Sequence, residues 1–103
     1  MVDDIAAAVY EDLIGRKYGE LDCWHLVLEM ARRLERSLEC YHETEGVPQA
    51  GDIVFIQGDA KPHVGMLVSA TRMIHSSRGT DGVAQHPWRM FKDRIQMILR
   101  PRT

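Results

Sequence analysis

The sequence has only two cysteines, Cys23 and Cys40, and no long apolar run. Nothing in it approaches the ~18 consecutive apolar residues of a membrane span, so no membrane partner is expected. The acidic start MVDDIAAAVYEDL lacks the basic end of a secretion signal, and Glu11 and Asp12 interrupt its apolar run. Two cysteines without such a signal indicate reduced thiols rather than disulfides. We therefore expect synthesis in the cytoplasm, with the place of action still open.

The chain also lacks a strong excess of charge of either sign. Its 13 lysines and arginines against 15 acidic residues give a formal net charge of −2, which provides no field for nucleic acid or an anionic membrane. The C-terminal stretch is locally basic through Lys92, Arg94, Arg100 and Arg102. We expect a solvated edge there rather than a nucleic-acid site.

What is present fits one soluble domain, residues 1–103, with 45% hydrophobic and 27% charged residues. A first helix is predicted over residues 3–14, ended by Gly15. A second is predicted over residues 22–38 with Asp22 as its N-cap. Its buried stripe is indicated by apolar residues at helical spacing, which are Cys23, Val27, Met30, Leu34 and Leu38.

The second half of the chain changes to the period of strands. A polar connector over residues 39–52 precedes the predicted strands 53–57, 63–69, 72–77, 83–86 and 94–100. Asp52 is expected to be a turn residue, and Trp88 and Phe91 to be core or groove wall. The pattern predicts an α+β fold, with two N-terminal helices packed on an antiparallel sheet of about five short strands.

Cys23 falls in the first turn of the second predicted helix. A free cysteine is usually a small buried hydrophobe. At a helix N-terminus, however, the unpaired backbone N–H groups and the helix dipole favour the thiolate, which is the nucleophilic form. The position alone leaves both interpretations open.

Two histidines on neighbouring predicted strands favour the chemical interpretation. A thiolate nucleophile needs a base, and the base needs a group that holds its tautomer. His63 opens one strand and His75 follows twelve positions later on the next. A three- or five-residue loop centred on Ala70 would place both on the same face of the sheet. If the second helix packs on that face, its N-terminus brings Cys23 to His63.

Four motifs in this order, DCWHLV, PQAGDIVFI, HVGMLV and RMIHSS, resemble the NlpC-type cell-wall cysteine peptidases. The resemblance extends from about residue 14 to residue 100, and its DCW and C-terminal segments look most similar to phage and prophage members. It implies a papain-like α+β fold and hydrolysis of peptide bonds in peptidoglycan stem peptides, often between γ-D-glutamate and diaminopimelate. It implies no cofactor and no metal. Possible places of action are a virion or the cell wall, with phage tail proteins as potential partners.

By position, the resemblance assigns Cys23 as nucleophile, His63 as general base and His75 as the residue that orients the base. Tyr18 is similar to a tyrosine beside the family's active site, and Asp22 to a residue of substrate recognition.

The two residues that follow the cysteine, Trp24 and His25, are expected to affect the cleft. Trp24 is expected to make the cleft more apolar. His25 stands where the family commonly has glycine, so we expect it to crowd the nucleophile's helix, narrowing the cleft or tuning the thiolate.

Two alternatives belong to other functional classes. One is a phage-tail or cell-wall binding module with the same fold and weak or absent catalysis. The other is a zinc-stabilised adaptor that uses the repeated Cys-x-His of residues 23–25 and 40–42. Helix geometry disfavours zinc, because residues i and i+2 point about 200° apart. Selective thiol reactivity and metal content distinguish the three possibilities.

Overall fold

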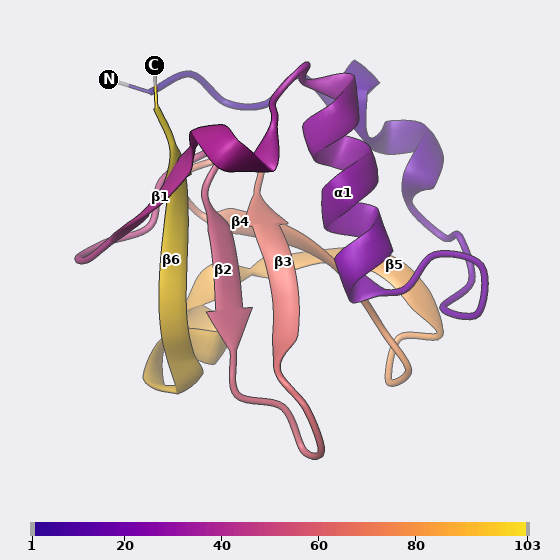
Figure 1. Ribbon diagram of the computed structural model, residues 1–103. Coiled ribbons are helices and arrows are strands. Elements are labelled where there is room, and N and C mark those ends of the chain that lie inside the picture. The colour runs from indigo at the N-terminus through magenta and orange to yellow at the C-terminus, as the bar shows by residue number, and fades with distance from the viewer. Residues whose placement is uncertain (1, 103) are drawn as a thin grey trace.

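The computed structural model describes residues 2–102, which form one α-helix, six strands and four short 3-10 helices (Figure 1). The strands make a single antiparallel sheet in the order β1-β6-β2-β3-β4-β5. Its elements are η1 (Ala7–Val9), η2 (Glu11–Leu13), α1 (Cys23–Arg33), η3 (Leu38–Cys40), β1 (Tyr41–Thr44), β2 (Ile53–Ile56), β3 (His63–Leu67), β4 (Arg72–Ser77), β5 (Gly82–Pro87), η4 (Trp88–Arg94) and β6 (Ile95–Pro101). The predicted α+β class is confirmed, with six strands instead of about five.

The helix α1 begins where the sequence predicts, at Cys23 after the N-cap Asp22, but it ends five residues early. Glu35 adopts a left-handed conformation (φ 57°), and the N–H of Arg36 bonds to the carbonyl of Ala31. This 6→1 bond around a left-handed residue is the Schellman termination. Leu38 is therefore 40% exposed in η3 and does not extend the buried stripe.

The N-terminal segment is helical only in the two short turns η1 and η2, not in one helix over residues 3–14. Contacts with the rest of the molecule explain the interruption. The N–H of Ile5 bonds to the carbonyl of Val68, and Arg33 of α1 bonds to both the Val9 carbonyl and the Asp12 carboxylate. These tertiary contacts outweigh the modest helix propensity of the segment.

The strand β1 lies within residues 39–52, which the sequence predicts to be a polar connector, so that prediction is wrong for residues 41–44. Its sequence YHET has no apolar alternation, but it pairs with β6 from Tyr41↔Pro101 to Thr44↔Ile98. It forms the edge of the sheet, where pairing on one side is sufficient. No helix within residues 2–102 is long and apolar enough to cross a membrane.

Asp52 does more than start its strand. It is fully buried, and its carboxylate accepts hydrogen bonds from Arg100 Nε at 3.0 Å and from an Arg100 terminal nitrogen at 2.9 Å. The hydrogen bond to Asp52 raises the pKa of Arg100. The pair joins the start of β2 to the end of β6, so Arg100 is a structural partner and not part of a solvated edge.

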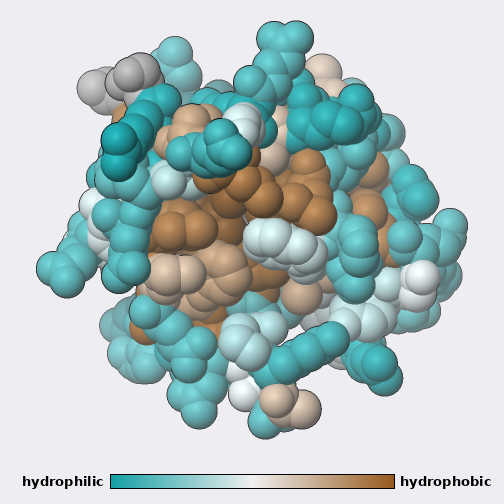
Figure 2. All heavy atoms as spheres, in the orientation of Figure 1, coloured by the Kyte–Doolittle hydropathy of each residue, from teal (hydrophilic) through white to brown (hydrophobic). Residues whose placement is uncertain are grey.

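The two faces of the sheet carry separate apolar cores. On one face, α1 packs against β3 and β4 through Leu26, Val27 and Met30. On the other face, Trp88 of η4 packs with side chains of β2, β3 and β4. Figure 2 shows apolar side chains gathered beside α1, where the helix leaves part of the first face open. The partly buried side chains that pack against this core include Leu34, Tyr41, Phe55 and Leu99.

Candidate active site

Cys23 lies on the wall of a pocket of about 580 Å³, although its side chain is only 8% exposed. Two bonds hold this end of the helix. The Asp22 carboxylate accepts the N–H of His25 at 2.9 Å, which caps α1. The buried hydroxyl of Ser76, on β4, donates to the Leu21 carbonyl at 2.6 Å. Because Leu21 is attached to β4 and Cys23 follows two residues later, the position of the thiol relative to the sheet is fixed.

The structure brings the two predicted histidines together. His63 Nε2 lies 2.9 Å from His75 Nδ1, and the ring centroids are 5.1 Å apart in an edge-to-face arrangement. The hairpin between β3 and β4 turns through Ser69, Ala70 and Thr71, since the N–H of Val68 bonds to the Arg72 carbonyl. The predicted same-face placement around Ala70 is thus confirmed.

Gly65 explains why β3 and β4 approach so closely here. It pairs with His75, and an added Cβ would lie 2.8 Å from the Ile74 carbonyl oxygen and 2.9 Å from the Met73 side chain. Contacts under about 3 Å are not tolerated without movement of the strands. The glycine of HVG therefore allows the two histidines to meet.

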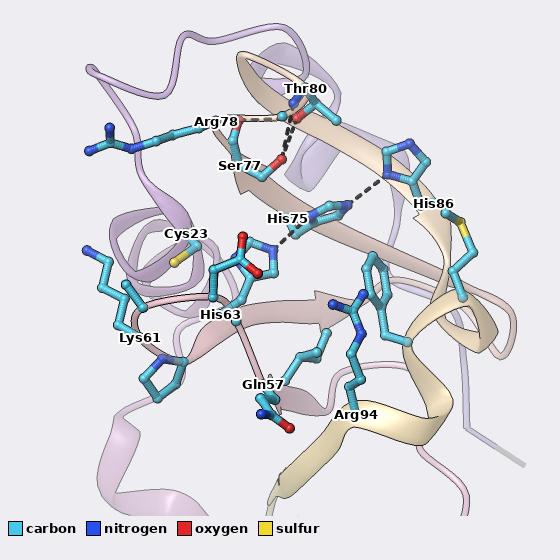
Figure 3. A pocket seen from close by; sticks show the side chains of 18 of the residues that line it. Cys23, Gln57, Lys61, His63, His75, Ser77, Arg78, Thr80, His86 and Arg94 are labelled. Atoms are coloured by element: carbon cyan, nitrogen blue, oxygen red, sulfur yellow. Dashed lines mark hydrogen bonds between the residues drawn. The ribbon is translucent and has the colours of Figure 1, made fainter.

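The route by which Cys23 reaches His63 differs from the expected one. Ile74 packs in the α1 core, so its neighbour His75 points to the opposite face, with Met73 and the second core. The helix and the histidines are therefore on opposite faces. Figure 3 shows Cys23 beside His63 where α1 begins, and both line the same pocket. Cys23 therefore reaches the pocket of the histidines from the N-terminal end of α1, and not from the face of the sheet that the helix covers.

Burial controls the charge of both histidines. His75 is 3% exposed, and burial, with smaller contributions from His63 and His86, lowers its pKa to about 4. Burial, and then the charge of Arg94, also lowers the pKa of His63. Both rings are therefore neutral near pH 7, so His63 is available as a base and His75 as its partner.

Tyr18 and Trp24 both line pockets that reach Cys23. Tyr18 lines the large pocket and a smaller one of about 210 Å³, and Arg78 lies over its ring at 5.4 Å. Trp24 lines only the smaller pocket, where its ring centroid is 6.3 Å from that of Phe55. The predicted apolar contribution of Trp24 therefore falls on one side of the cleft.

His25 does not crowd the thiol. Its Nδ1 lies 2.8 Å from the Asp22 carboxylate, its side chain is 66% exposed, and it lines neither pocket. The hydrogen bond from the His25 backbone N–H is the main reason that the pKa of Asp22 lies below its usual range. The residue in place of the family glycine thus reinforces the helix cap.

The repeated Cys-x-His does not gather into one site. Cys23 faces the pocket while His25 faces Asp22, and the Cys40 thiol donates to the Ser37 carbonyl at 2.8 Å. Within residues 2–102, no group of three or more His, Cys, Asp or Glu side chains is arranged to hold a metal ion. The described geometry gives the zinc-adaptor alternative no support.

Sequence reasoning missed two residues of the site. His86 of β5 lies behind His75, with its Nδ1 2.8 Å from His75 Nε2. Ser76 holds the helix start. Phe91 of η4, expected to be core or groove wall, lines the pocket and packs edge-on against His75 at 5.5 Å. The signal for His86 was its place at the end of a predicted strand that follows the His75 strand. The β4–β5 register, which places His86 opposite Met73, was needed to use that signal.

Comparison with known families agrees with the resemblance found in the sequence. A profile of the NlpC/P60 family matches residues 12–100, a segment that contains Cys23, His63 and His75. No curated protein matches the chain. The expected phage or prophage origin is not tested by this match and stays a prediction.

Proposed function

The chain belongs to the NlpC/P60 family, whose members are generally hydrolases that act on peptidoglycan, and on this premise we propose that it is a cysteine peptidase of stem peptides. Cys23 is the nucleophile, His63 the general base and His75 the orienting residue, in a papain-like arrangement. One observation carries the proposal. His63 Nε2 bonds to His75 Nδ1, so His63 Nδ1 is the nitrogen that can take the proton of Cys23, which lines the same pocket (Figure 3).

The reaction follows from this arrangement. His63 takes the thiol proton of Cys23, and the sulfur attacks the peptide carbonyl carbon, so that the carbonyl electron pair moves onto oxygen. The tetrahedral intermediate collapses, the C–N bond breaks, and His63 returns the proton to the leaving amine. Water then attacks the thioester while His63 takes one of its protons. The second tetrahedral intermediate collapses with cleavage of the C–S bond, His63 returns its proton to the thiolate, and the acid product leaves and loses its remaining proton to solvent.

The start of α1 also suits the oxyanion. N–H groups of the first helical turn have no carbonyl partner within the helix. The His25 N–H is already bonded to Asp22, whereas the N–H of Cys23 is adjacent to the sulfur. It can therefore donate to the developing negative charge, helped by the helix dipole.

The charges around the large pocket favour a substrate with carboxylates. Three cationic side chains line it, Lys61, Arg78 and Arg94, against one carboxylate, Asp59. A bond between γ-D-glutamate and diaminopimelate has carboxylates on both sides, which these cations can bind. In the smaller pocket beside Cys23, the Asp22 carboxylate can bind an amine of the peptide, and Trp24 limits bulk. We therefore propose this linkage as the bond cleaved.

The test uses a γ-D-Glu-diaminopimelate tripeptide or tetrapeptide and whole sacculi, with products identified by mass spectrometry. The expected result is cleavage of that linkage by the wild type and by Cys40→Ala, and none by Cys23→Ala. Cys40 is the matched control because it is the second thiol of the chain. Cleavage that survives Cys23→Ala would refute the nucleophile.

Absence of cleavage, combined with Cys23-independent binding to sacculi or to a phage tail protein, would favour the binding module. In either case the place of action, virion or cell wall, stays a prediction.

A further inference from the structure

His86 completes a line of three histidine rings that leads away from the thiol. His63 Nε2 lies 2.9 Å from His75 Nδ1, and His75 Nε2 lies 2.8 Å from His86 Nδ1 (Figure 3). The rings come from β3, β4 and β5, and His86 sits diagonally from His75 on the same face of the sheet. Both nitrogens of His75 are therefore committed to histidine partners.

The two bonds of His75 must run in the same direction. Burial keeps this ring neutral near pH 7, and a neutral imidazole has one N–H and one bare nitrogen. His75 thus either accepts from His63 and donates to His86, or accepts from His86 and donates to His63. Ring positions alone do not distinguish these two states, but the chemistry does.

Only one direction is compatible with His63 as a base. Once His63 has taken the thiol proton, it has an N–H on both nitrogens, so its Nε2 must donate to His75 Nδ1. His75 then has its own proton on Nε2, and that proton needs an acceptor. We propose that His86 is a positioning residue whose Nδ1 accepts this N–H and so fixes the direction of the line for catalysis.

This inference rests on the proposed peptidase function and adds a residue to it. Without His86, the nitrogen of His75 would face the pocket, where water can donate as easily as accept. His75 would then distribute between its two tautomers, and only one of them supports the imidazolium of His63. Removal of His86 should therefore lower kcat and leave KM nearly unchanged, because His86 stabilises a state formed after the substrate has bound.

The first test reads the tautomer directly. In ¹⁵N-labelled protein at pH 7, ring nitrogen NMR should find the His75 proton on Nε2, with Nδ1 bare, and the His63 proton on Nε2. A His75 proton on Nδ1 in the wild type would overturn the proposal. This measurement needs no substrate, so it stands even if the wild type cleaves no peptide, which is the outcome that refutes the proposed function instead.

The second test uses variants of His86. His86→Leu should lower kcat about tenfold, the lower end of the effect of removing a histidine's outer partner in metal sites. His86→Asn should recover most of kcat, because its Oδ1 can take the place of Nδ1 as acceptor. Gln85→Ala is the matched control on the same strand, since its side chain contacts Arg72 and not His75. Equal kcat in His86→Leu and wild type would overturn the proposal; if His86→Leu fails to fold, the tautomer measurement decides.

Discussion

At the scale of single residues, the chemistry depends on what surrounds Cys23 and His63. The thiol belongs to the first turn of a helix, whose backbone N–H groups can meet the negative charge that develops during attack. The imidazole beside it is backed by a ring that burial keeps neutral. These two conditions differ from those of Cys40, whose thiol lies at a 3-10 turn and bonds to a backbone carbonyl.

Selective alkylation follows from that difference. At about pH 6, below the ~8.5 of an ordinary thiol pKa, iodoacetamide should label Cys23 well before Cys40, because His63 beside Cys23 can take its proton, whereas the Cys40 thiol donates to the Ser37 carbonyl. Peptide mapping by mass spectrometry measures both rates in one sample. His63→Ala should slow the labelling of Cys23 and leave that of Cys40 unchanged. Equal rates for the two thiols, neither faster than a free-thiol peptide, would contradict the assignment of the nucleophile.

The two central histidines should differ in importance. His63→Ala removes the group that carries the proton, so turnover should fall to the background level. His75→Gln or His75→Asn keeps a polar partner for His63 and should retain a measurable fraction of kcat. Initial rates on the tripeptide substrate measure both. If His75→Gln is as inactive as His63→Ala, the division into base and orienter is wrong.

The sequence alone predicted Cys23, His63 and His75 because each has a local signal. A helix cap marks the cysteine, and a shared strand parity marks the two histidines. Ser76 has no such signal, since its partner Leu21 is 55 positions away in the chain, and the strand position of His86 is informative only once the β4–β5 register is known. Only the pairing of β4 with β5, and the docking of the helix start on β4, give them a role.

At the scale of elements, the attachment of α1 to β4 sets the position of the thiol. The helix packs across the sheet through its apolar stripe, but that stripe alone permits sliding along the strands. The bond from Ser76 to the Leu21 carbonyl fixes the N-terminal end. Both residues are buried, so this bond has no replacement from solvent.

Ser76→Ala should therefore affect both stability and rate. Leaving the Leu21 carbonyl buried without a donor costs about 1–3 kcal/mol of unfolding free energy. A small shift of Cys23 would lower kcat by up to about 10²-fold, because attack geometry is strict. Urea unfolding and steady-state kinetics measure the two effects. The exposed Glu45, in the loop after β1, changed to alanine, is the control and should alter stability by less than about 0.5 kcal/mol. A wild-type kcat in Ser76→Ala would show that the bond does not position the thiol.

The predicted elements failed where tertiary contacts override local preference. Residues 3–14 have a helical pattern, but docking on Val68 and Arg33 divides it into two turns. The helix α1 ends early because Glu35 adopts the left-handed conformation, which sequence assigns mainly to glycine or asparagine. The strand β1 is recognisable only from its partner β6. The largely buried strands β2 to β4 were predicted nearly to their ends.

At the scale of the whole molecule, the buried histidines make folding sensitive to acid. The pKa of His75 is about 4 in the folded state, against ~6.5 for an unfolded histidine. Between these values the unfolded chain binds a proton that the native chain does not, so stability falls as the pH falls. At about 1.4 kcal/mol per pH unit, the loss approaches about 3 kcal/mol near pH 4.

Chemical unfolding at pH 7.5 and at pH 4.5 measures this effect. The free energy of unfolding should be lower at pH 4.5, and His75→Gln should make the difference between the two pH values smaller. Comparing differences, not absolute stabilities, removes the direct cost of the substitution. The pKa values of Asp12, Asp22 and Glu29 are lowered by their hydrogen bonds, so these carboxylates also lose stabilisation as the pH approaches their unfolded values of ~4, but this loss is common to wild type and His75→Gln and cancels in the comparison. An unchanged pH difference in His75→Gln would mean that another group is responsible.

The central claim is that the Cys23 sulfur attacks a peptide carbonyl, and a trapped thioester tests it most directly. The wild type is mixed with the γ-D-Glu-diaminopimelate substrate, quenched in acid at short times and weighed intact, with peptide mapping to locate any adduct. The expected result is a mass increase equal to the acyl part of the substrate, without the amine product, on the peptide that contains Cys23, and no increase in Cys23→Ala. Substrate cleavage at a measurable rate with an adduct at another residue, or an adduct of equal yield in Cys23→Ala, would contradict it.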